Sequence, residues 1–265
     1  TSLYNKMADL WDEYDHPDDQ ITYVVESLRS SGVEKSITHE YLGCNCEDKC
    51  IPETCSCLLR SGGHYSYEDK SQLQNYSLVI TDKNKPVYEC SPNCKCEPSR
   101  CGNRLVSFGP RSNLKIVTTP KGLGLSTERD IETGNFICEY AGEVITRDDA
   151  HKRFKKYQEM NFNHNYIFCI NENFGDRNIK TFVDPTFYGN IGRYINHSCD
   201  PNCLLVPVRV EDEVPKLCIF AKEKIEVMNE LTFDYGEGDG NISEKKKCLC
   251  MSHKCRKYLP FDGTI

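Results

Sequence analysis

The segment RYINHSCDPN, residues 193–202, is the most distinctive stretch of this chain. It gathers polar side chains, a histidine and a cysteine into a short span and ends on the turn signal Asp-Pro-Asn. By itself, such a segment is as often a polar loop with satisfied hydrogen bonds as a functional site. Its meaning therefore depends on the motifs around it.

Four further motifs flank this segment in a fixed order: KGLG (121–124), EYAGE (139–143), LTFDYG (231–236) and CLCMSHKC (248–255). Alone, KGLG indicates a turn after a strand, and the helix that a dinucleotide site requires does not follow it. LTFDYG alone indicates a core strand that ends on a buried tyrosine. Each motif is modest, and the information lies in the set.

The chain has 265 residues, of which 17 are cysteines. An odd number fits poorly with a closed disulfide framework, and the acidic N-terminus shows no secretion-signal pattern. Clustered cysteines in a reducing compartment are typically metal ligands, so we predict zinc. A disulfide-rich secreted protein is the alternative, and the intact mass after thiol alkylation distinguishes the two.

Nine cysteines form two neighbouring groups with the patterns C-x-C-x3-C-x4-C-x-C and C-x3-C-x-C-x4-C. Three tetrahedral zinc ions need twelve ligand positions, which nine sulfurs supply if three of them each bridge two ions. The arithmetic predicts a trinuclear cluster; two four-cysteine sites with one spare thiol are the alternative. The predicted ligands are Cys44, Cys46, Cys50, Cys55, Cys57, Cys90, Cys94, Cys96 and Cys101.

A third group at the C-terminus, Cys248, Cys250 and Cys255, is one thiol short of a tetrahedral site. We predict that Cys199 supplies the fourth ligand, which would fasten the tail to the middle of the chain and bring the total to four zinc ions. Three more cysteines lie in apolar runs and are predicted to be small core residues: Cys138, Cys169 and Cys218.

Composition limits the class of protein and the kind of partner. With 38% hydrophobic and 28% charged residues the chain is typical of a globular protein, and no apolar run approaches the ~20 residues of a membrane span. The formal net charge of −7 argues against a chain that coats nucleic acid through positive charge. It favours a basic partner instead.

The elements expected along the chain indicate an α+β fold that is mostly β. One helix is predicted to start at Thr146, with Ala150, Phe154 and Tyr157 on one face. Residues 58–89 are polar and are predicted to be a long surface insertion. The predicted strands are 21–25, 114–118, 136–140, 166–170, 217–221 and 231–235.

Together, the five motifs and the nine-cysteine block resemble the SET-domain protein lysine methyltransferases with pre-SET and post-SET segments. The resemblance covers about residues 44–258 and implies a β-rich SET fold with a pseudoknot, in which the segments around residues 193–199 and 231–236 cross. It implies four parts: an acidic N-terminal segment (1–43), a pre-SET zinc-cluster region (44–105), a SET catalytic domain (106–236) and a post-SET zinc segment (237–265). S-adenosylmethionine is the implied methyl donor and a lysine amine the acceptor.

The resemblance also implies roles for individual residues. Tyr235 is expected to be the catalytic hydroxyl, with Tyr140 and Phe233 lining the lysine channel. Leu249, between two predicted zinc ligands, is expected to cover the adenine, and Asn196 and His197 to contact the adenosine part. The remaining expected cofactor contacts are Lys121, Gly122, Leu123, Tyr166 and Arg193.

These choices agree with the chemistry of methyl transfer to an amine. A free lysine has a pKa near ~10.4, so it must lose a proton before it can act as a nucleophile. An aromatic channel disfavours the charged ammonium, and tyrosine hydroxyls orient the lone pair. Phenylalanine at position 233, in place of tyrosine, leaves room for a methyl group, and we therefore predict that the enzyme can produce dimethyl-lysine.

Two positions depart from the family pattern. The turn before the catalytic strand, Val227–Glu230, lacks the usual glycine. Asn229 can tolerate a left-handed conformation, so we expect a different turn with intact chemistry. Met251 stands where the post-SET segment usually has a glycine, which affects only the expected local loop shape.

The resemblance and the acidic charge together predict a histone tail peptide or nucleosome as the partner, in the nucleus and on the chromosome. We expect no membrane contact, a monomer, and no direct DNA binding except through a fused domain. The alternative function is a catalytically weak SET module that binds chromatin as a zinc-stabilised reader. The presence of Tyr235, Asn196, His197 and Cys199 together favours the enzyme.

Overall fold

The computed structural model of the chain describes residues 14–17, 20–33, 43–47, 50–66, 76–160, 166–175, 177–211, 213–236 and 246–260. Trp11, which belongs to the expected N-terminal segment, lies outside these residues. Within the described part, no helix is long and apolar enough to cross a membrane.

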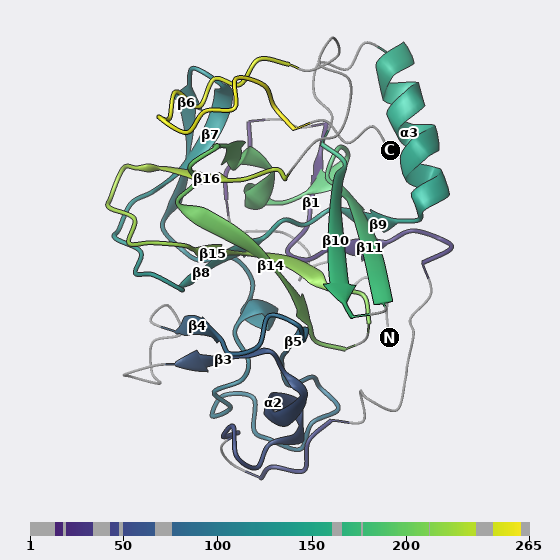
Figure 1. Cartoon of the computed structure of the whole chain (residues 1–265), viewed down its shortest axis with the longest axis vertical. Helices are drawn as coiled ribbons and strands as arrows, with labels where there is room; N and C mark the ends of the chain where they lie inside the picture. The colour runs from purple at the N-terminus through teal and green to yellow at the C-terminus, as the bar shows by residue number, and fades with distance from the viewer. Residues whose placement is uncertain are drawn as a thin grey trace.

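The described part of the chain is mostly β, as the sequence predicted, with small sheets stacked around a shared core (Figure 1). The longer helix is α3 (Arg147–Glu159), and α2 (Ser56–Arg60) is a single turn among the cysteines. The strands are β1 (Thr22–Tyr23), β2 (Leu28–Arg29), β3 (Gly63–Ser66), β4 (Ser77–Ile80), β5 (Val87–Tyr88), β6 (Leu114–Thr119), β7 (Gly122–Thr127), β8 (Phe136–Glu139), β9 (Glu143–Ile145), β10 (Phe168–Phe174), β11 (Arg177–Asp184), β12 (Tyr188–Gly189), β13 (Asn196–His197), β14 (Cys203–Arg209), β15 (Lys216–Ala221) and β16 (Glu230–Phe233).

Three of the sheets have four strands each, in the orders β10-β11-β9-β2, β13-β16-β7-β6 and β5-β14-β15-β8. Their shared core contains fully buried aliphatic side chains such as Leu125, Ile137 and Leu217. The predicted strand at 166–170 begins later, at Phe168, and extends to Phe174 because it pairs along its whole length with β11.

The crossing expected from the family resemblance is present as a parallel pairing of two short strands. β13 runs beside β16, with Asn196 opposite Thr232 and His197 opposite Phe233. Residues 36 positions apart in the sequence thus become direct neighbours, which brings the RYINHSC and LTFDYG motifs into one site.

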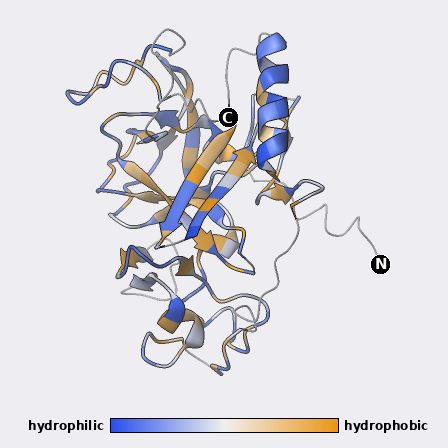
Figure 2. Ribbon diagram, turned by 45° about the vertical axis from the view of Figure 1, so that its right-hand side comes forward, coloured by the Kyte–Doolittle hydropathy of each residue, from blue (hydrophilic) through white to orange (hydrophobic). Residues whose placement is uncertain are grey.

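Helix α3 begins where the sequence predicted, because the Thr146 hydroxyl accepts a hydrogen bond from the backbone N–H of Asp149. Ala150 and Tyr157 are buried against the sheet, while Figure 2 shows most of the helix surface as hydrophilic. Arg153 bonds both Glu143 (2.7 Å) and Asp184 (2.9 Å), which fastens the helix to β9 and β11.

The described residues before position 34 include two short strands that pair with strands much later in the chain. β1 pairs in parallel with β12, and β2 pairs in parallel with β9. The hydroxyl of Tyr23 forms a buried 2.8 Å hydrogen bond with that of Tyr194, which belongs to the RYINHSC motif. The expected strand at 21–25 is therefore present in shortened form, and it contacts the RYINHSC segment through Tyr23.

The prediction of a long surface insertion over residues 58–89 is wrong for the part that the structure describes. Tyr65 and Tyr76 are buried in an apolar cluster, and β3 and β4 form a hairpin. Glu89 is buried as well, and its carboxylate accepts hydrogen bonds from the Tyr65 hydroxyl (2.7 Å) and from the backbone N–H of Leu105 (2.8 Å). Aromatic burial and this buried acceptor outweigh the polar composition of the segment.

Candidate active site and zinc sites

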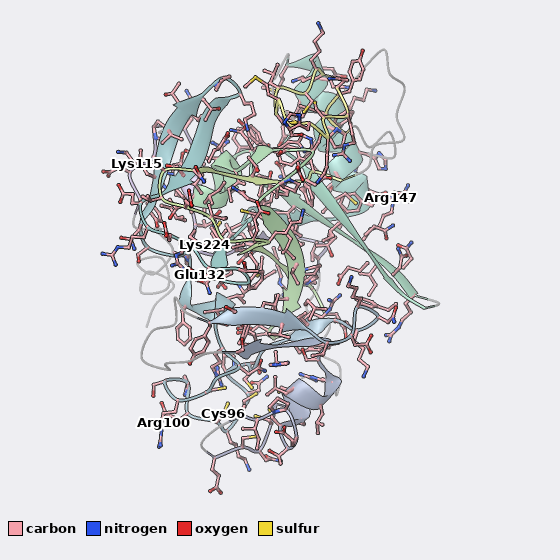
Figure 3. The ribbon with its side chains drawn as sticks, turned by 60° about the vertical axis from the view of Figure 1, so that its left-hand side comes forward. Cys96, Arg100, Lys115, Glu132, Arg147 and Lys224 are labelled. Atoms are coloured by element: carbon pink, nitrogen blue, oxygen red, sulfur yellow. The ribbon has the colours of Figure 1, made fainter. Side chains whose placement is uncertain are left out.

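The nine cysteines of the first two groups form one cluster at one end of the molecule. All are buried except Cys46, which is half-buried. Figure 3 shows Cys96 among the sulfur atoms of this cluster. The two groups are joined by a hydrogen bond from the backbone N–H of Lys95 to the carbonyl of Cys44 (2.9 Å).

The sulfur atoms of this cluster fit a shared metal centre better than separate sites. Three sets of four have all their sulfurs within 4.8 Å of one another, and the sets overlap: Cys44 belongs to all three, and Cys50 and Cys90 to two each. Bridging sulfurs produce such overlap, whereas isolated tetrahedral sites would share no ligand. All 17 cysteines are free thiols in the structure. The number of zinc ions stays a prediction.

Hydrogen-bond donors surround the cluster, as thiolate ligands require. The Arg104 guanidinium lies 3.6 Å from the Cys96 sulfur, and the Asn103 amide nitrogen lies 3.5 Å from the Cys90 sulfur.

The C-terminal group takes the fourth partner that the sequence suggested. The sulfurs of Cys199, Cys248, Cys250 and Cys255 lie within 4.8 Å of one another, and all four residues are half-buried. The backbone N–H of Arg256 donates to the Cys199 sulfur (3.3 Å). Four thiols at this spacing are a complete tetrahedral donor set for zinc.

The expected channel residues form one aromatic cluster. The ring centroid of Phe233 lies 4.8 Å from that of Tyr235 and 5.9 Å from that of Tyr140. Phe168 completes the cluster, 5.6 Å from Phe233 and 5.7 Å from Tyr140. Sequence reasoning placed a strand there but did not single out Phe168, although an aromatic residue two positions after Tyr166 was a usable signal.

Both tyrosine hydroxyls of the cluster are held by backbone carbonyls. The Tyr235 hydroxyl donates to the carbonyl of Ile195 (2.9 Å), and the Tyr140 hydroxyl donates to the carbonyl of Tyr166 (2.9 Å). Burial raises the pKa of Tyr235 and that of Tyr140 above the usual value near 10. Both groups are therefore neutral hydroxyls at physiological pH.

His197 is buried, and both of its ring nitrogens have contacts. Nδ1 accepts a hydrogen bond from the backbone N–H of Tyr235 (3.2 Å), and Nε2 lies 3.2 Å from the Cys199 sulfur. Burial lowers the pKa of His197 to about 4, with a smaller opposing effect of Asp234. The imidazole is therefore neutral. Both ring nitrogens of His197 already have contacts, so neither is available for the adenosine contact expected from the sequence.

The KGLG turn is fastened to β13 by a carboxylate that sequence reasoning missed. Glu230 accepts from the amide nitrogen of Asn196 (2.9 Å) and pairs with the Lys121 ammonium (2.8 Å). The same Asn196 nitrogen donates to the carbonyl of Leu123 (3.0 Å). Because Glu230 directly precedes the LTFDYG motif, its place at the start of that strand was the available signal.

The residues expected at the cofactor fit a bound S-adenosylmethionine. Gly122 has a φ of +106° with open space where a side chain would stand. Leu123 and Leu249 are apolar yet about half exposed, at 44% and 51%. The Arg193 guanidinium lies 4.6 Å above the Tyr166 ring, and its buried Nε has no hydrogen-bond partner among the described residues. An orphaned cationic donor is suited to the carboxylate of the cofactor.

The left-handed residue in the turn before β16 is Met228 (φ +67°) and not Asn229, which the sequence offered as the residue able to tolerate that conformation. The Met228 N–H donates to the Thr127 carbonyl (2.8 Å), which places the reversal one residue earlier. Met251 also has a positive φ, +53°. Both exposed methionines thus keep the backbone conformation for which the family uses glycine.

Comparison with known proteins identifies the family to which this fold and site belong. The SET domain family model matches residues 122–236, and the Pre-SET motif model matches residues 4–104. The chain is 41% identical to the probable histone-lysine N-methyltransferase set-23 of Caenorhabditis briggsae, over 83% of this chain and 88% of that protein.

Solved structures are also similar. The methyltransferase domain of human SETMAR is 35% identical with a TM-score of 0.76, over 95% of this chain and 93% of that one. KRYPTONITE, solved with DNA, an H3(1-15) peptide and SAH, is 27% identical with a TM-score of 0.72, over 92% of this chain and 48% of that one. The chain belongs to the SET-domain histone-lysine N-methyltransferases. It is an S-adenosylmethionine-dependent protein lysine methyltransferase with a pre-SET region.

Proposed function

We propose that this enzyme transfers methyl groups from S-adenosylmethionine to a lysine ε-amine on a histone tail, and that Tyr235 is its catalytic hydroxyl. The observation that carries the proposal is the Tyr235 hydroxyl, held at 2.9 Å by the Ile195 carbonyl beside the Phe233 ring. Both partners lie where the two crossing motifs meet.

S-adenosylmethionine supplies an electrophilic methyl group on a positively charged sulfur, and the reaction is an in-line displacement. The residues of the chain favour the uncharged form of the substrate lysine amine and orient it. The aromatic walls disfavour the charged ammonium, so the substrate loses its proton to water more readily. Tyr235 and the nearby backbone carbonyls then orient the nitrogen lone pair and limit its rotation. A general-base carboxylate is not needed.

For the cofactor, we propose that Arg193 binds the carboxylate and Tyr166 packs beside the same end. Lys121, Gly122 and Leu123 line it through their backbone, with Asn196 and the His197 backbone at the adenosine part. Leu249 covers the adenine. Glu230 holds Lys121 and Asn196 in register across this site.

We propose that zinc binds both cysteine groups, three ions in the nine-cysteine cluster and one at Cys199, Cys248, Cys250 and Cys255. The overlap of the sulfur sets supports three shared ions. Native mass spectrometry beside metal analysis tests the total of four. We also retain the division at residues 43, 105 and 236 as the proposed domain boundaries.

We further propose that the products include dimethyl-lysine. Phe233 is 1% exposed and has no hydroxyl, so it cannot hold a water molecule next to the amine. A second methyl group can occupy that space. Phe233→Tyr should shift the products toward monomethyl-lysine while first-step turnover changes by less than about tenfold, or roughly 1.4 kcal/mol. Mass spectrometry of one peptide over time tests this, and a native enzyme that stops at monomethyl-lysine under excess cofactor contradicts it.

The partner we propose is a histone tail, alone or in a nucleosome, and the compartment is the nucleus. The chain's net charge of −7 and the H3 peptide bound to KRYPTONITE support this choice. We propose that the isolated chain is monomeric and does not itself bind DNA.

The test of the function is methyl transfer from labelled cofactor onto each purified histone in turn. Tyr235→Phe should abolish most transfer while SAH affinity stays nearly constant, since only an orienting hydroxyl is lost. Tyr188→Phe is the matched control, because it removes the same hydroxyl from a half-buried tyrosine in β12, outside the residues assigned to the lysine channel and the cofactor. Histone binding without turnover would favour the reader module instead.

A further inference from the structure

The His197 ring lies between Tyr235 and the candidate C-terminal zinc site and bonds in both directions. Its Nδ1 atom is 3.2 Å from the Tyr235 backbone nitrogen, and its Nε2 atom is 3.2 Å from the Cys199 sulfur. The side chain is 2% exposed, and its ring centroid is 5.3 Å from that of Tyr235. No solvent is needed to satisfy either nitrogen.

The chemistry of the two partners fixes which nitrogen carries the proton. A backbone N–H can only donate, so Nδ1 must be unprotonated to accept from Tyr235. The neutral ring then carries its hydrogen on Nε2. A zinc-bound Cys199 is a thiolate and can only accept. One tautomer therefore satisfies both contacts, and the opposite tautomer satisfies neither.

The position of His197 in the crossing explains how one ring reaches both sites. β13 places His197 opposite Phe233, and the Ser198 N–H donates to the Phe233 carbonyl (3.1 Å). Tyr235 follows two residues after Phe233, and Cys199 follows two residues after His197. Tyr235 and Cys199 therefore each lie two residues beyond the last pair of the two strands, one on either side of His197.

We propose that His197 is a positioning residue that couples the C-terminal zinc site to the backbone of Tyr235. Nε2–H stabilises the Cys199 thiolate, and Nδ1 fixes the residue that bears the catalytic hydroxyl. This rests on the proposed roles of Tyr235 and of the four-cysteine zinc site. Zinc binding then orders Tyr235, and by linkage an ordered Tyr235 strengthens zinc binding.

Two variants separate the two hydrogen bonds. In His197→Gln the amide nitrogen reaches the Nε2 position and can still donate to Cys199. In His197→Asn the amide oxygen reaches the Nδ1 position and can still accept from Tyr235. Cys250→Ser, which removes a ligand without touching His197, identifies the C-terminal zinc during release to a chromogenic chelator.

We expect His197→Asn to weaken the C-terminal zinc by about tenfold or more, as loss of a hydrogen bond to a metal ligand does. His197→Gln should keep zinc affinity within about threefold by the same argument. At saturating zinc and cofactor the order of kcat should reverse, with His197→Gln the slower of the two. Parallel losses of zinc affinity and kcat in both variants would mean a merely structural role and overturn the proposal.

A measurement on the native chain keeps the proposal testable if a variant fails to fold. With 15N-labelled histidine, the His197 resonances should show a protonated Nε2 and an unprotonated Nδ1, and removal of the C-terminal zinc should shift them. The opposite tautomer in the zinc-loaded protein contradicts the coupling. Absence of zinc from the C-terminal site in native mass spectra contradicts the proposed zinc site itself, which is a separate outcome.

Discussion

The two cysteine regions lie at opposite ends of the molecule (Figure 1) and differ in burial and in the origin of their ligands. Eight of the nine cysteines in the pre-SET cluster are buried, whereas all four residues of the C-terminal site are half-buried. The pre-SET ligands come from residues 44–57 and 90–101 and form a sulfur-rich core with Leu58. The C-terminal site instead joins three tail residues to Cys199, within the active-site segment.

This difference separates two uses of the same chemistry. The pre-SET cysteines and Leu58 form the core of their region, so zinc bound there would contribute directly to folding. The C-terminal site joins three tail cysteines to Cys199 of the active-site segment, so zinc bound there would contribute to the assembly of the active site. Loss of the first should unfold a region, and loss of the second should disable a folded enzyme.

The largest contrast is expected between Cys90→Ser and Cys250→Ser. Cys90 belongs to two overlapping sulfur sets, so its loss should destabilise the chain by more than about 3 kcal/mol and lower the yield of folded protein. Cys250→Ser should leave the unfolding midpoint within a few degrees but remove most methyl transfer. Thermal unfolding and activity measured together test this, with Cys169→Ser as the control thiol outside both groups. Equal destabilisation by the two variants contradicts the contrast.

Stepwise chelation should divide the same two regions without mutation. A mild chelator should first remove one zinc per chain, from the half-buried site, with loss of activity and unchanged far-ultraviolet circular dichroism. A stronger chelator should then remove the remaining zinc and unfold the pre-SET region. Native mass spectrometry at each step counts the ions. Simultaneous release of all zinc would show that the two regions are not independent.

Acid should affect the zinc-bound cysteines, and alkali should affect the buried tyrosines. Protonation of thiolates releases zinc at low pH. Buried tyrosines respond to alkali instead, because burial raises the pKa of the channel residues Tyr140 and Tyr235 above the usual value near 10, and that of Tyr157 on α3 to about 12. Their stabilising contribution is complete below the unfolded pKa of about 10 and is lost as pH rises above it.

Absorbance of tyrosinate beside zinc release, followed from pH 4 to pH 12, checks this order. Zinc release should be confined to the acid end of the titration, and the buried tyrosines should ionise only together with unfolding at its alkaline end. Ionisation of all fifteen tyrosines near pH 10 in the folded enzyme would contradict the raised pKa values.

The smallest effects are expected at the two left-handed methionines. Met251→Gly, at φ +53° beside the C-terminal site, and Met228→Gly, at φ +67°, should each stabilise the chain by about 0.5 kcal/mol. Relief of the left-handed conformation exceeds the added flexibility of the unfolded chain only slightly. Met160→Gly, at φ −82°, is the control and should destabilise. Urea unfolding midpoints measure all three, and a loss of stability at both test positions contradicts the argument.

Much of the candidate site could be predicted from short-range patterns. The spacing of Cys248, Cys250 and Cys255 brings three sulfurs together within one loop, and Thr146 with Asp149 marks the start of α3 because capping acts over three residues. The two-residue spacing of Phe233 and Tyr235 predicts a common face, and their ring centroids are 4.8 Å apart although β16 itself ends at Phe233.

Features that depend on distant partners could not be predicted in the same way. Phe168, Glu230 and the Tyr23–Tyr194 pair have ordinary local sequences, and each matters only because of a partner far along the chain. The surface insertion predicted for residues 58–89 is wrong for the same reason. The Glu89 carboxylate accepts its hydrogen bonds from the Leu105 N–H and the Tyr65 hydroxyl, both inside the protein.

Local patterns in the sequence establish the chemistry: thiol ligands in countable sets, a tyrosine at the end of a strand, a family pattern of ordered motifs and a net charge of −7. Which groups meet depends on the tertiary fold. The parallel pairing of β13 with β16 places His197 between Tyr235 and Cys199, and no local spacing encodes that arrangement. The physical reason is that a parallel pairing of distant segments is stabilised by the whole folded core, whereas sequence spacing constrains only residues within a few positions of one another.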